Sequence, residues 1–502
     1  MRRCIINNQL ALPANHRLPA KDDAMSLTRR RFLEDSLLAT AAAAAASAPR
    51  TLIADDQPAK GPNDRITAAI IGCGVRGKQH ASELGKLADC QIAYVCDPDS
   101  VRAGELAATI GAKYGKAPKA VQDLRRVYDD KTVDVVFIAA PNHWHALAAI
   151  WAMQASKDVY VEKPVSHNIS EGRRIVQAAR KLGRICQGGT QYRSSGSWIE
   201  AIEYLRAGKL GDVKLAKSIV YGRRGSIGKP GKYEIPASVD YNLFAGPAPL
   251  DPLTRPQLHY DWHWVWNTGN GELGNNNIHT LDICRWGLGV SGLGREVISY
   301  GGRLGYEDAG ETPNTQVCIF DFGDKTIVAE TRGLKTEPFK PKNGCVFYGS
   351  EGIIAGGSLF DLEGKLVRDF GGKSHNHFAN FLKAVRSRKV SDQNADIAEG
   401  HQSTALCHAG NISYRLGRPA SPDEIQERLG QLKVHENVQE TFARTRQHLA
   451  DNKVDLQKTR LTLGMPLRID GDRESFLDNS PADAMLTRDY RRPFVVPGES
   501  EV

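Results

Sequence analysis

The stretch from Arg65 to Gly77, RITAAIIGCGVRG, limits most strongly how this chain can fold. The apolar run 66–71 is typical of a buried parallel strand, and the residues after the glycines place apolar side chains on one helical face. Gly72 permits a tight turn, Gly74 lets backbone approach a pyrophosphate, and Gly77 lets the helix pack closely on the strand. Because the first N–H groups of that helix would face the phosphates, we predict a dinucleotide site here.

A carboxylate follows the next predicted strand at the distance that a dinucleotide fold requires. Strand 91–96 is followed by Asp97, 20 residues after Gly77, where an acidic side chain accepts hydrogen bonds from the adenosine ribose hydroxyls. The charge of Asp97 would repel a 2′-phosphate, and no arginine follows it directly. We therefore predict NAD as the cofactor, with NADP the less favoured dinucleotide.

The order of the predicted elements indicates an α/β protein with two domains. Strand and helix patterns alternate from Ile66 to about Gln187, which predicts an N-terminal Rossmann dinucleotide-binding domain with a doubly wound parallel sheet. From Val213 onward, strand-like runs predict an α+β domain with a largely antiparallel open sheet. The predicted boundaries are 1–61 for an export signal and linker, 62–187 for the Rossmann domain, 188–420 for the second domain, and 421–502 for a C-terminal extension. The family resemblance described below implies that the second domain serves substrate binding and oligomerisation.

The first 61 residues carry a pattern of their own. The segment TRRRFL, residues 28–33, precedes an alanine-rich run to Ala48 and resembles a twin-arginine export signal. The run is too short and too weakly apolar to span a bilayer, so we expect no stable membrane span once the signal is removed. An alanine-rich first helix of the fold is the alternative. We predict a periplasmic or otherwise exported protein, and either Met1 or Met25 could be its start.

The charge distribution and the spacing of cysteines and histidines argue against a nucleic-acid-binding protein and against a metal site. Residues 1–54 hold eight basic and four acidic side chains, so half of the net charge of +8 lies there, and no nucleic-acid motif or dense basic stripe follows. The nine cysteines include no CxxC pair, which favours small core residues over a disulfide framework or zinc site. His143 and His145 lack a third ligand at suitable spacing. We therefore expect neither a nucleic-acid partner nor a metal.

Five motifs follow one another in the order IIGCGVRG, PNHWH, EKPVS, GTQYR and GELGNNNIHTLD. Together they resemble, over about residues 64–420, the family of glucose-fructose oxidoreductase, inositol dehydrogenase and MocA. The resemblance implies NAD(P)-dependent oxidation or reduction of a small carbohydrate, polyol or cyclitol by a homo-oligomer, a dimer or tetramer. It also implies that the cofactor is lined by Asn142, His145, Glu162, Gln191 and Arg193.

The same resemblance implies the catalytic residues. Lys163 of the EKP motif would lie beside the nicotinamide, where burial lowers a lysine pKa and allows proton donation or shuttling. His279 matches the histidine of a D-x-x-x-H pattern, but the carboxylate position holds Asn275, and an amide cannot take a proton. Either His279 works without the carboxylate, or Lys163 carries more of the acid–base role. Asp282 either orients His279 or is structural.

Three tryptophans alternate further along the chain. If their segment is extended, Trp262, Trp264 and Trp266 share one face and His263 lies on the opposite one. Aromatic faces stack well on sugar rings, but they also fill cores, so either role is open.

The leading interpretation is an exported NAD-dependent oxidoreductase that acts on a carbohydrate or cyclitol. One alternative is a glycoside hydrolase that oxidises and re-reduces its substrate with bound NAD and no net redox change. The other is a non-catalytic carbohydrate or nucleotide binder, which the asparagine at position 275 would permit.

Overall fold

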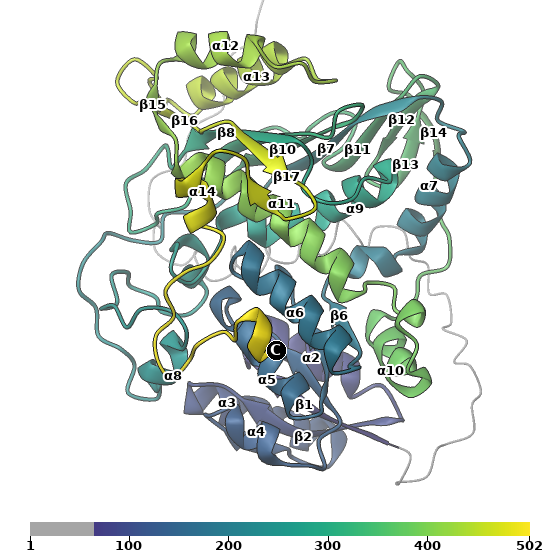
Figure 1. The fold of residues 1–502 in the computed structure, drawn as a ribbon, viewed down its shortest axis with the longest axis vertical. Coiled ribbons are helices and arrows are strands. Elements are labelled where there is room, and N and C mark those ends of the chain that lie inside the picture. The colour runs from purple at the N-terminus through teal and green to yellow at the C-terminus, as the bar shows by residue number, and fades with distance from the viewer. Residues whose placement is uncertain (1–64) are drawn as a thin grey trace, which may run out of the picture. The chain divides into compact units, whose positions relative to one another are not determined.

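The computed structural model describes residues 65–502 (Figure 1). The predicted export signal and Cys4 lie outside the described residues. Among the helices of the described part, none has the length and apolarity needed to cross a membrane.

A six-stranded parallel sheet forms the N-terminal domain, with strand order β3-β2-β1-β4-β5-β6. In this doubly wound order, β1 to β3 extend the sheet to one side and β4 to β6 extend it to the other. Ligands bind at the switch point between β1 and β4. The strands are β1 (Ile66–Ile71), β2 (Cys90–Cys96), β3 (Lys119–Val121), β4 (Val135–Ile138), β5 (Asp158–Val161) and β6 (Cys186–Gly188). The helices are α2 (Val75–Leu84), α3 (Ser100–Tyr114), α4 (Arg125–Asp129), α5 (Asn142–Gln154) and α6 (Ile169–Lys181).

A twelve-stranded mixed sheet forms the second domain, and only β7 and β10 pair in parallel within it. Its main path runs β14-β13-β12-β11-β7-β10-β9-β8-β16-β15. In chain order, the first eight strands of this sheet are β7 (Val213–Tyr221), β8 (Glu296–Gly302), β9 (Thr315–Asp321), β10 (Thr326–Arg332), β11 (Gly344–Gly349), β12 (Gly352–Ala355), β13 (Ser358–Phe360) and β14 (Leu366–Asp369). The helices that follow β6 in the chain are α7 (Gly196–Arg206), α8 (Tyr241–Ala245), α9 (Ile278–Leu288), α10 (His377–Ser387) and α11 (Ile397–Arg415). Of these, α10 packs through Phe378 and Phe381 on the N-terminal sheet. The predicted fold class is confirmed.

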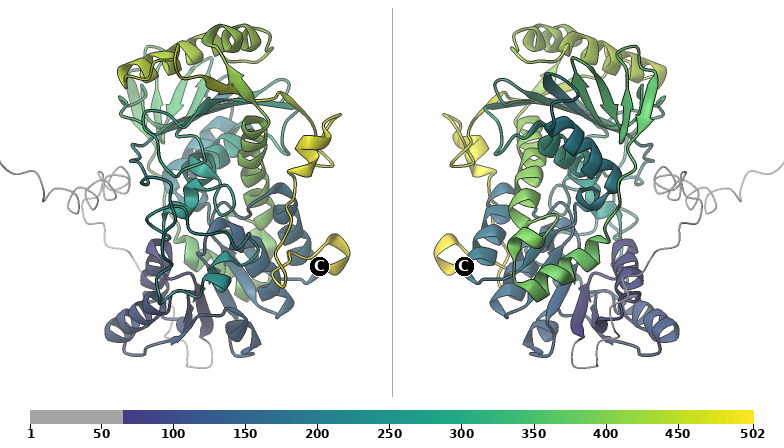
Figure 2. Two further views of the ribbon diagram at one scale, coloured as in Figure 1. Left: turned by 90° about the vertical axis from the view of Figure 1, so that its left-hand side faces the viewer. Right: turned by 90° about the vertical axis from the view of Figure 1, so that its right-hand side faces the viewer.

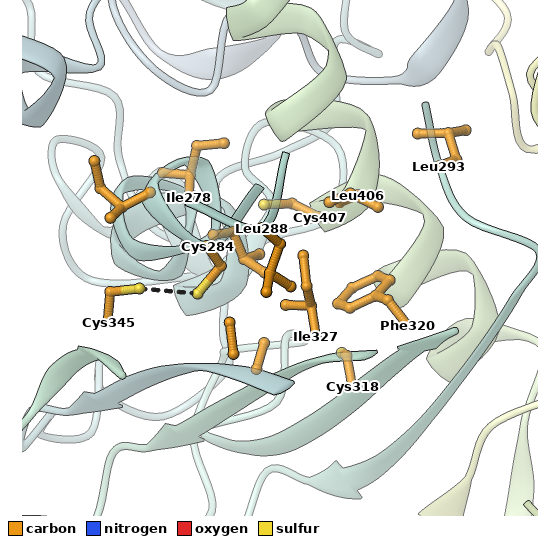
Figure 3. Close-up of a cluster of buried hydrophobic side chains, with 14 of the residues drawn as sticks. Ile278, Cys284, Leu288, Leu293, Cys318, Phe320, Ile327, Cys345, Leu406 and Cys407 are labelled. Carbon is orange, nitrogen blue, oxygen red and sulfur yellow. Dashed lines mark hydrogen bonds between the residues drawn. The ribbon is translucent and has the colours of Figure 1, made fainter. Parts of the chain in front are cut away.

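Helix α9 is held against this sheet by a tightly packed core. Figure 3 shows Leu288 of α9 beside Ile327 of β10, and both side chains are buried in the same cluster as Ile278. The Cys284 and Cys345 sulfurs lie 3.1 Å apart in the same core (Figure 3). Since core side chains pack at crystal-like density, α9 is a rigid support for the residues at its N-terminal end.

Residues 421–502 take part in both domains. Strands β16 and β17 pair with β8, and α12 and α13 cover the face of the sheet that points away from α9 (Figure 2). The chain end returns to the Rossmann domain near α5 (Figure 1). There the Phe494 ring packs edge-on against Trp144 of α5. The elements from position 418 onward are β15 (Arg418–Ala420), α12 (Pro422–Gly430), α13 (Val438–Asp451), β16 (Leu461–Leu463), β17 (Leu467–Asp470), β18 (Ser475–Phe476) and α14 (Ser480–Ala484).

Candidate active site

A cavity of about 450 Å³ opens where β1, β2 and β4 end. It begins at the glycine turn after β1 and passes Asn142 at the start of α5. It continues to Lys163 and to the segment 259–263 of the second domain. Both domains therefore contribute to one site.

Two of the predicted glycines occupy places where no other residue fits. Gly72 has a φ of +93°, and a Cβ there would lie 2.5 Å from the carbonyl oxygen of Ala139. A Cβ on Gly77 would lie 1.9 Å from the carbonyl oxygen of Gly72. Gly74 lines the cavity next to the exposed Val75 at the start of α2. This tight turn before a helix fits the pyrophosphate of a dinucleotide.

Asp97 lines the cavity together with the glycine turn. Its two carboxylate oxygens accept hydrogen bonds from the backbone N–H groups of Cys73 (2.7 Å) and Asp99 (2.9 Å). Burial raises the pKa of Asp97, and these two N–H groups act against the rise.

Arg102 also lines the cavity near Asp97, and sequence reasoning missed it. The signal was Asp99, which caps α3 and so places Arg102 in the first turn of that helix.

Glu162 contacts three polar side chains at the cavity wall. Its Oε1 atom accepts from Arg76 Nε at 2.7 Å and from Gln191 Nε2 at 3.1 Å, and it lies 2.9 Å from His80 Nε2. Burial would raise the pKa of Glu162, but Arg76 and His80 outweigh it and hold that pKa well below its usual range. Glu162 and Arg76 line the cavity. Gln191 lies behind them, where its amide also donates to Tyr160.

Lys163 follows Glu162 at the end of β5, and its ammonium group spans the two domains. Lys163 Nζ donates to the backbone carbonyl oxygen of Asn275 at 2.7 Å. Burial lowers the pKa of Lys163 to about 8, with the charge of Glu162 acting in the opposite direction. A lysine with this pKa can give or take a proton near neutral pH.

Helix α5 fixes the loop after Lys163. The helix begins at Asn142, with Pro141 as its extended N-terminal cap. His145 in its first turn lies 2.6 Å from the Pro164 carbonyl oxygen through Nδ1 and 2.7 Å from the Ala140 carbonyl oxygen through Nε2. The Asn142 amide donates to the Asn270 side chain at 2.9 Å. Asn142 and His145 both line the cavity.

The segment between Glu272 and His279 is not a regular α-helix. Residues Leu273–Asn277 form a π-helical turn before α9, and such turns are frequent at functional sites. Asn275 lines the cavity, and its Nδ2 donates to Glu272 Oε2 at 3.4 Å. His279 lies outside the lining, with a buried Nδ1 that has no hydrogen-bond partner in the described chain. Burial holds the pKa of His279 well below its usual range.

Arg193 and Asp282 lie away from the cavity lining and form a buried ion pair. Arg193 donates through Nε to Asp282 Oδ2 at 2.7 Å and through Nη2 to Oδ1 at 2.8 Å. Ser403 of α11 donates to the same Oδ1 atom. The pair thus joins the segment after β6 to α9 and α11.

The expectation of an extended tryptophan segment is wrong. Asp261–Trp264 is a 3₁₀-helical turn, and three residues per turn do not keep alternate side chains on one face. Trp262 and His263 both line the cavity and stack with ring centroids 3.6 Å apart. Trp264 is buried beneath the guanidinium of Arg224. Sequence reasoning therefore missed His263, because one short turn leaves no periodic signal.

The predicted histidine pair makes backbone contacts. His143 Nε2 lies 2.9 Å from the Phe244 carbonyl oxygen, and both nitrogens of His145 face carbonyl oxygens. Within residues 65–502, no group of three or more His, Cys, Asp or Glu side chains gathers in a way that could hold a metal ion.

Two domain models of one oxidoreductase family match the chain. The model described as an NAD-binding Rossmann fold matches residues 66–190, and the one described as a C-terminal alpha/beta domain matches residues 226–446.

Curated relatives of this chain are oxidoreductases as well. Inositol 2-dehydrogenase of Salmonella typhimurium is 28% identical over 35% of this chain and 50% of its own length, so the chain spans about half of that relative. The scyllo-inositol 2-dehydrogenase (NAD(+)) of Bacillus subtilis is 24% identical over 72% of this chain and 97% of its own length.

Solved structures share the fold. The WlbA dehydrogenase from Bordetella pertussis, solved with NADH and UDP-GlcNAcA, superposes with a TM-score of 0.51 at 19% identity, over 69% of this chain and 95% of that one.

Proposed function

The chain belongs to the NAD-binding oxidoreductase family of glucose-fructose oxidoreductase, inositol dehydrogenase and MocA, and on this premise we propose that it oxidises or reduces a hydroxyl-bearing carbon of a sugar, polyol or cyclitol. NAD, when bound, supplies the group that exchanges a hydride with that carbon. The observation that carries the proposal is the position of Lys163, which lines the cavity between the glycine turn and the second domain.

The residues around Lys163 suit the proton transfer that such a reaction needs. An alcohol loses its hydroxyl proton when its carbon is oxidised, and a carbonyl gains one when it is reduced. Lys163 Nζ is the titratable group at this point, held by the Asn275 carbonyl oxygen at 2.7 Å. Glu162 stays ionised beside it and offsets part of the cost of burying the ammonium group.

A substrate screen with the purified protein tests the proposal. Wild-type protein is mixed with NAD and a panel of sugars, polyols and inositols, and NADH formation is followed by absorbance. The proposed dehydrogenase forms NADH in proportion to oxidised substrate. Glycoside cleavage without net NADH would instead identify the redox-neutral hydrolase, and binding of a sugar with neither reaction would identify a binder. Either result would overturn the proposal.

We also propose export by the twin-arginine route. The support is the segment TRRRFL at residues 28–33 and the alanine-rich run after it. Replacing Arg29 and Arg30 with lysines in the full chain should leave the protein in the cytoplasmic fraction, whereas the unaltered chain should appear outside it. Equal distribution of the two proteins would contradict export by this route.

A further inference from the structure

We propose that His263 accepts a hydrogen bond from a substrate hydroxyl and, beside Lys163, fixes the orientation of the reacting substrate. The inference rests on the function proposed above and names a second residue of that site. It also predicts the substrate class, which is an uncharged polyhydroxy compound.

The tautomer of His263 follows from its backbone contact. His263 Nδ1 faces the carbonyl oxygen of Tyr260 within hydrogen-bond distance. A carbonyl oxygen only accepts, so Nδ1 carries the proton, and Nε2 of a neutral ring keeps its lone pair. Burial lowers the pKa of His263 to about 3, so the ring is neutral at ordinary pH. His263 therefore offers an acceptor in the cavity that it lines.

Two aromatic rings pack against the ring of His263. The Trp262 ring stacks on it at 3.6 Å with an interplanar angle of 19°, and the Tyr260 ring lies 4.8 Å away. Both aromatic residues also line the cavity. An acceptor that is fixed before substrate binds loses little conformational entropy on binding, so its hydrogen bond contributes more to affinity and orientation.

The charges around His263 favour a substrate without a carboxylate. Lys163 and Arg224 are the two cations whose charges act on His263. Glu162 offsets the charge of Lys163, and Glu272 pairs with Arg224 through contacts of 3.0 Å and 3.2 Å. Arg224 Nη1 also donates to the Tyr260 hydroxyl at 3.2 Å. A paired guanidinium does not attract an anionic group strongly, whereas the neutral acceptor of His263 suits a hydroxyl donor.

The decisive variant is His263→Phe, which keeps an aromatic ring against Trp262 but has no acceptor. With the substrate found in the screen, we expect kcat/KM to fall by about 10- to 100-fold. The affinity for NADH, measured by fluorescence titration, should stay within about threefold because the contact is to substrate. His263→Gln, whose amide oxygen can accept, should recover part of the loss. The exposed His435 supplies a matched control, His435→Gln.

Deoxygenated substrates show whether the contact is to one hydroxyl. For wild-type protein, removal of one particular hydroxyl should cost about the same factor as His263→Phe, and that analogue should react equally with both proteins. Equal kcat/KM for wild-type and His263→Phe on the full substrate would overturn the His263 inference and leave the proposed function intact. Failure of wild-type protein to act on any uncharged polyhydroxy compound would overturn both. Preference for a sugar acid would overturn the predicted substrate class.

Discussion

The ammonium group of Lys163 donates its 2.7 Å hydrogen bond to the backbone carbonyl oxygen of Asn275, and not to the Asn275 side chain. The contact therefore does not depend on which side chain stands at position 275. The asparagine at position 275, where the D-x-x-x-H pattern has a carboxylate, therefore leaves this anchor of Lys163 in place. The carboxylate nearest to Asn275 belongs instead to Glu272, one turn earlier in the chain.

Replacing Lys163 with methionine should remove the proton-transfer group and keep most of its volume. We expect kcat to fall by about 10²- to 10⁴-fold, with NADH affinity little changed. Since burial lowers the pKa of Lys163 to about 8, the lysine is protonated below that pH and neutral above it. The rate of alcohol oxidation by wild-type protein should rise with pH around a midpoint near 8. A Lys163→Met protein that retains this midpoint would show that another group titrates.

Introducing a carboxylate by Asn275→Asp should destabilise the protein. The Asn275 amide now donates to Glu272 Oε2 at 3.4 Å, so aspartate would place two buried carboxylates together. Like charges raise the pKa of one carboxylate, so stability relative to wild type should be lost as pH rises through that raised pKa. We expect a melting temperature several degrees lower at pH 8 than for Asn275→Ala, with the gap closing in acid. An aspartate variant as stable as wild type at both pH values would contradict this account.

The sequence predicted those parts of the fold whose signals are local. Ile66–Ile71 is a buried strand in both prediction and structure, and the first strand of the second domain, β7, begins at Val213 as predicted. Short elements without periodicity were missed, among them β3 (Lys119–Val121). Long-range partners were missed as well, because nothing in the sequence near Asn275 says that Lys163 reaches its carbonyl group.

In the candidate site too, residues with local sequence signals were predicted and residues placed by long-range contacts were missed. Gly72 and Gly77 were found because their steric requirement acts within one turn. The roles of Arg76 and His80 were missed, since both contact Glu162 from more than 80 positions away. The face of His263 could be given only for an extended segment, and the segment is a 3₁₀ turn. Sequence reasoning finds side chains that backbone geometry requires, and it misses those placed by tertiary contacts.

Asp97 should influence both cofactor affinity and cofactor choice. Its oxygens hold the N–H groups of Cys73 and Asp99, so Asp97→Ala frees the glycine turn as well as removing the negative charge. We expect NAD affinity to fall by about 10- to 100-fold, while NADP affinity falls less because a 2′-phosphate is no longer repelled. Fluorescence titration with NADH and NADPH measures both affinities. A further Arg102→Ala change should then weaken NADPH more than NADH, because Arg102 lines this end of the cavity. Equal losses for the two dinucleotides after Asp97→Ala would remove Asp97 from cofactor choice.

Glu171 should make the stability of the protein depend on pH. This carboxyl group on α6 is 1% exposed, and burial raises its pKa to about 7 despite hydrogen bonds from the His167 N–H group and the Tyr490 hydroxyl. The usual glutamate pKa is near 4.3, so the folded protein holds this proton over a range where the unfolded chain has lost it. Its contribution to stability is therefore complete below about pH 4 and is lost as pH rises through 7, by an amount on the order of 3 kcal/mol.

Glu171→Gln keeps the size of the side chain and cannot ionise. Urea unfolding from pH 5 to pH 8 should show wild-type protein losing stability relative to Glu171→Gln as pH rises. The exposed Glu427 gives a matched control, and Glu427→Gln should follow the wild-type pH dependence. Parallel curves for wild type and Glu171→Gln would mean that Glu171 is ionised in the folded protein throughout this range. The contacts from His167 and Tyr490 would then stabilise the carboxylate more than burial destabilises it.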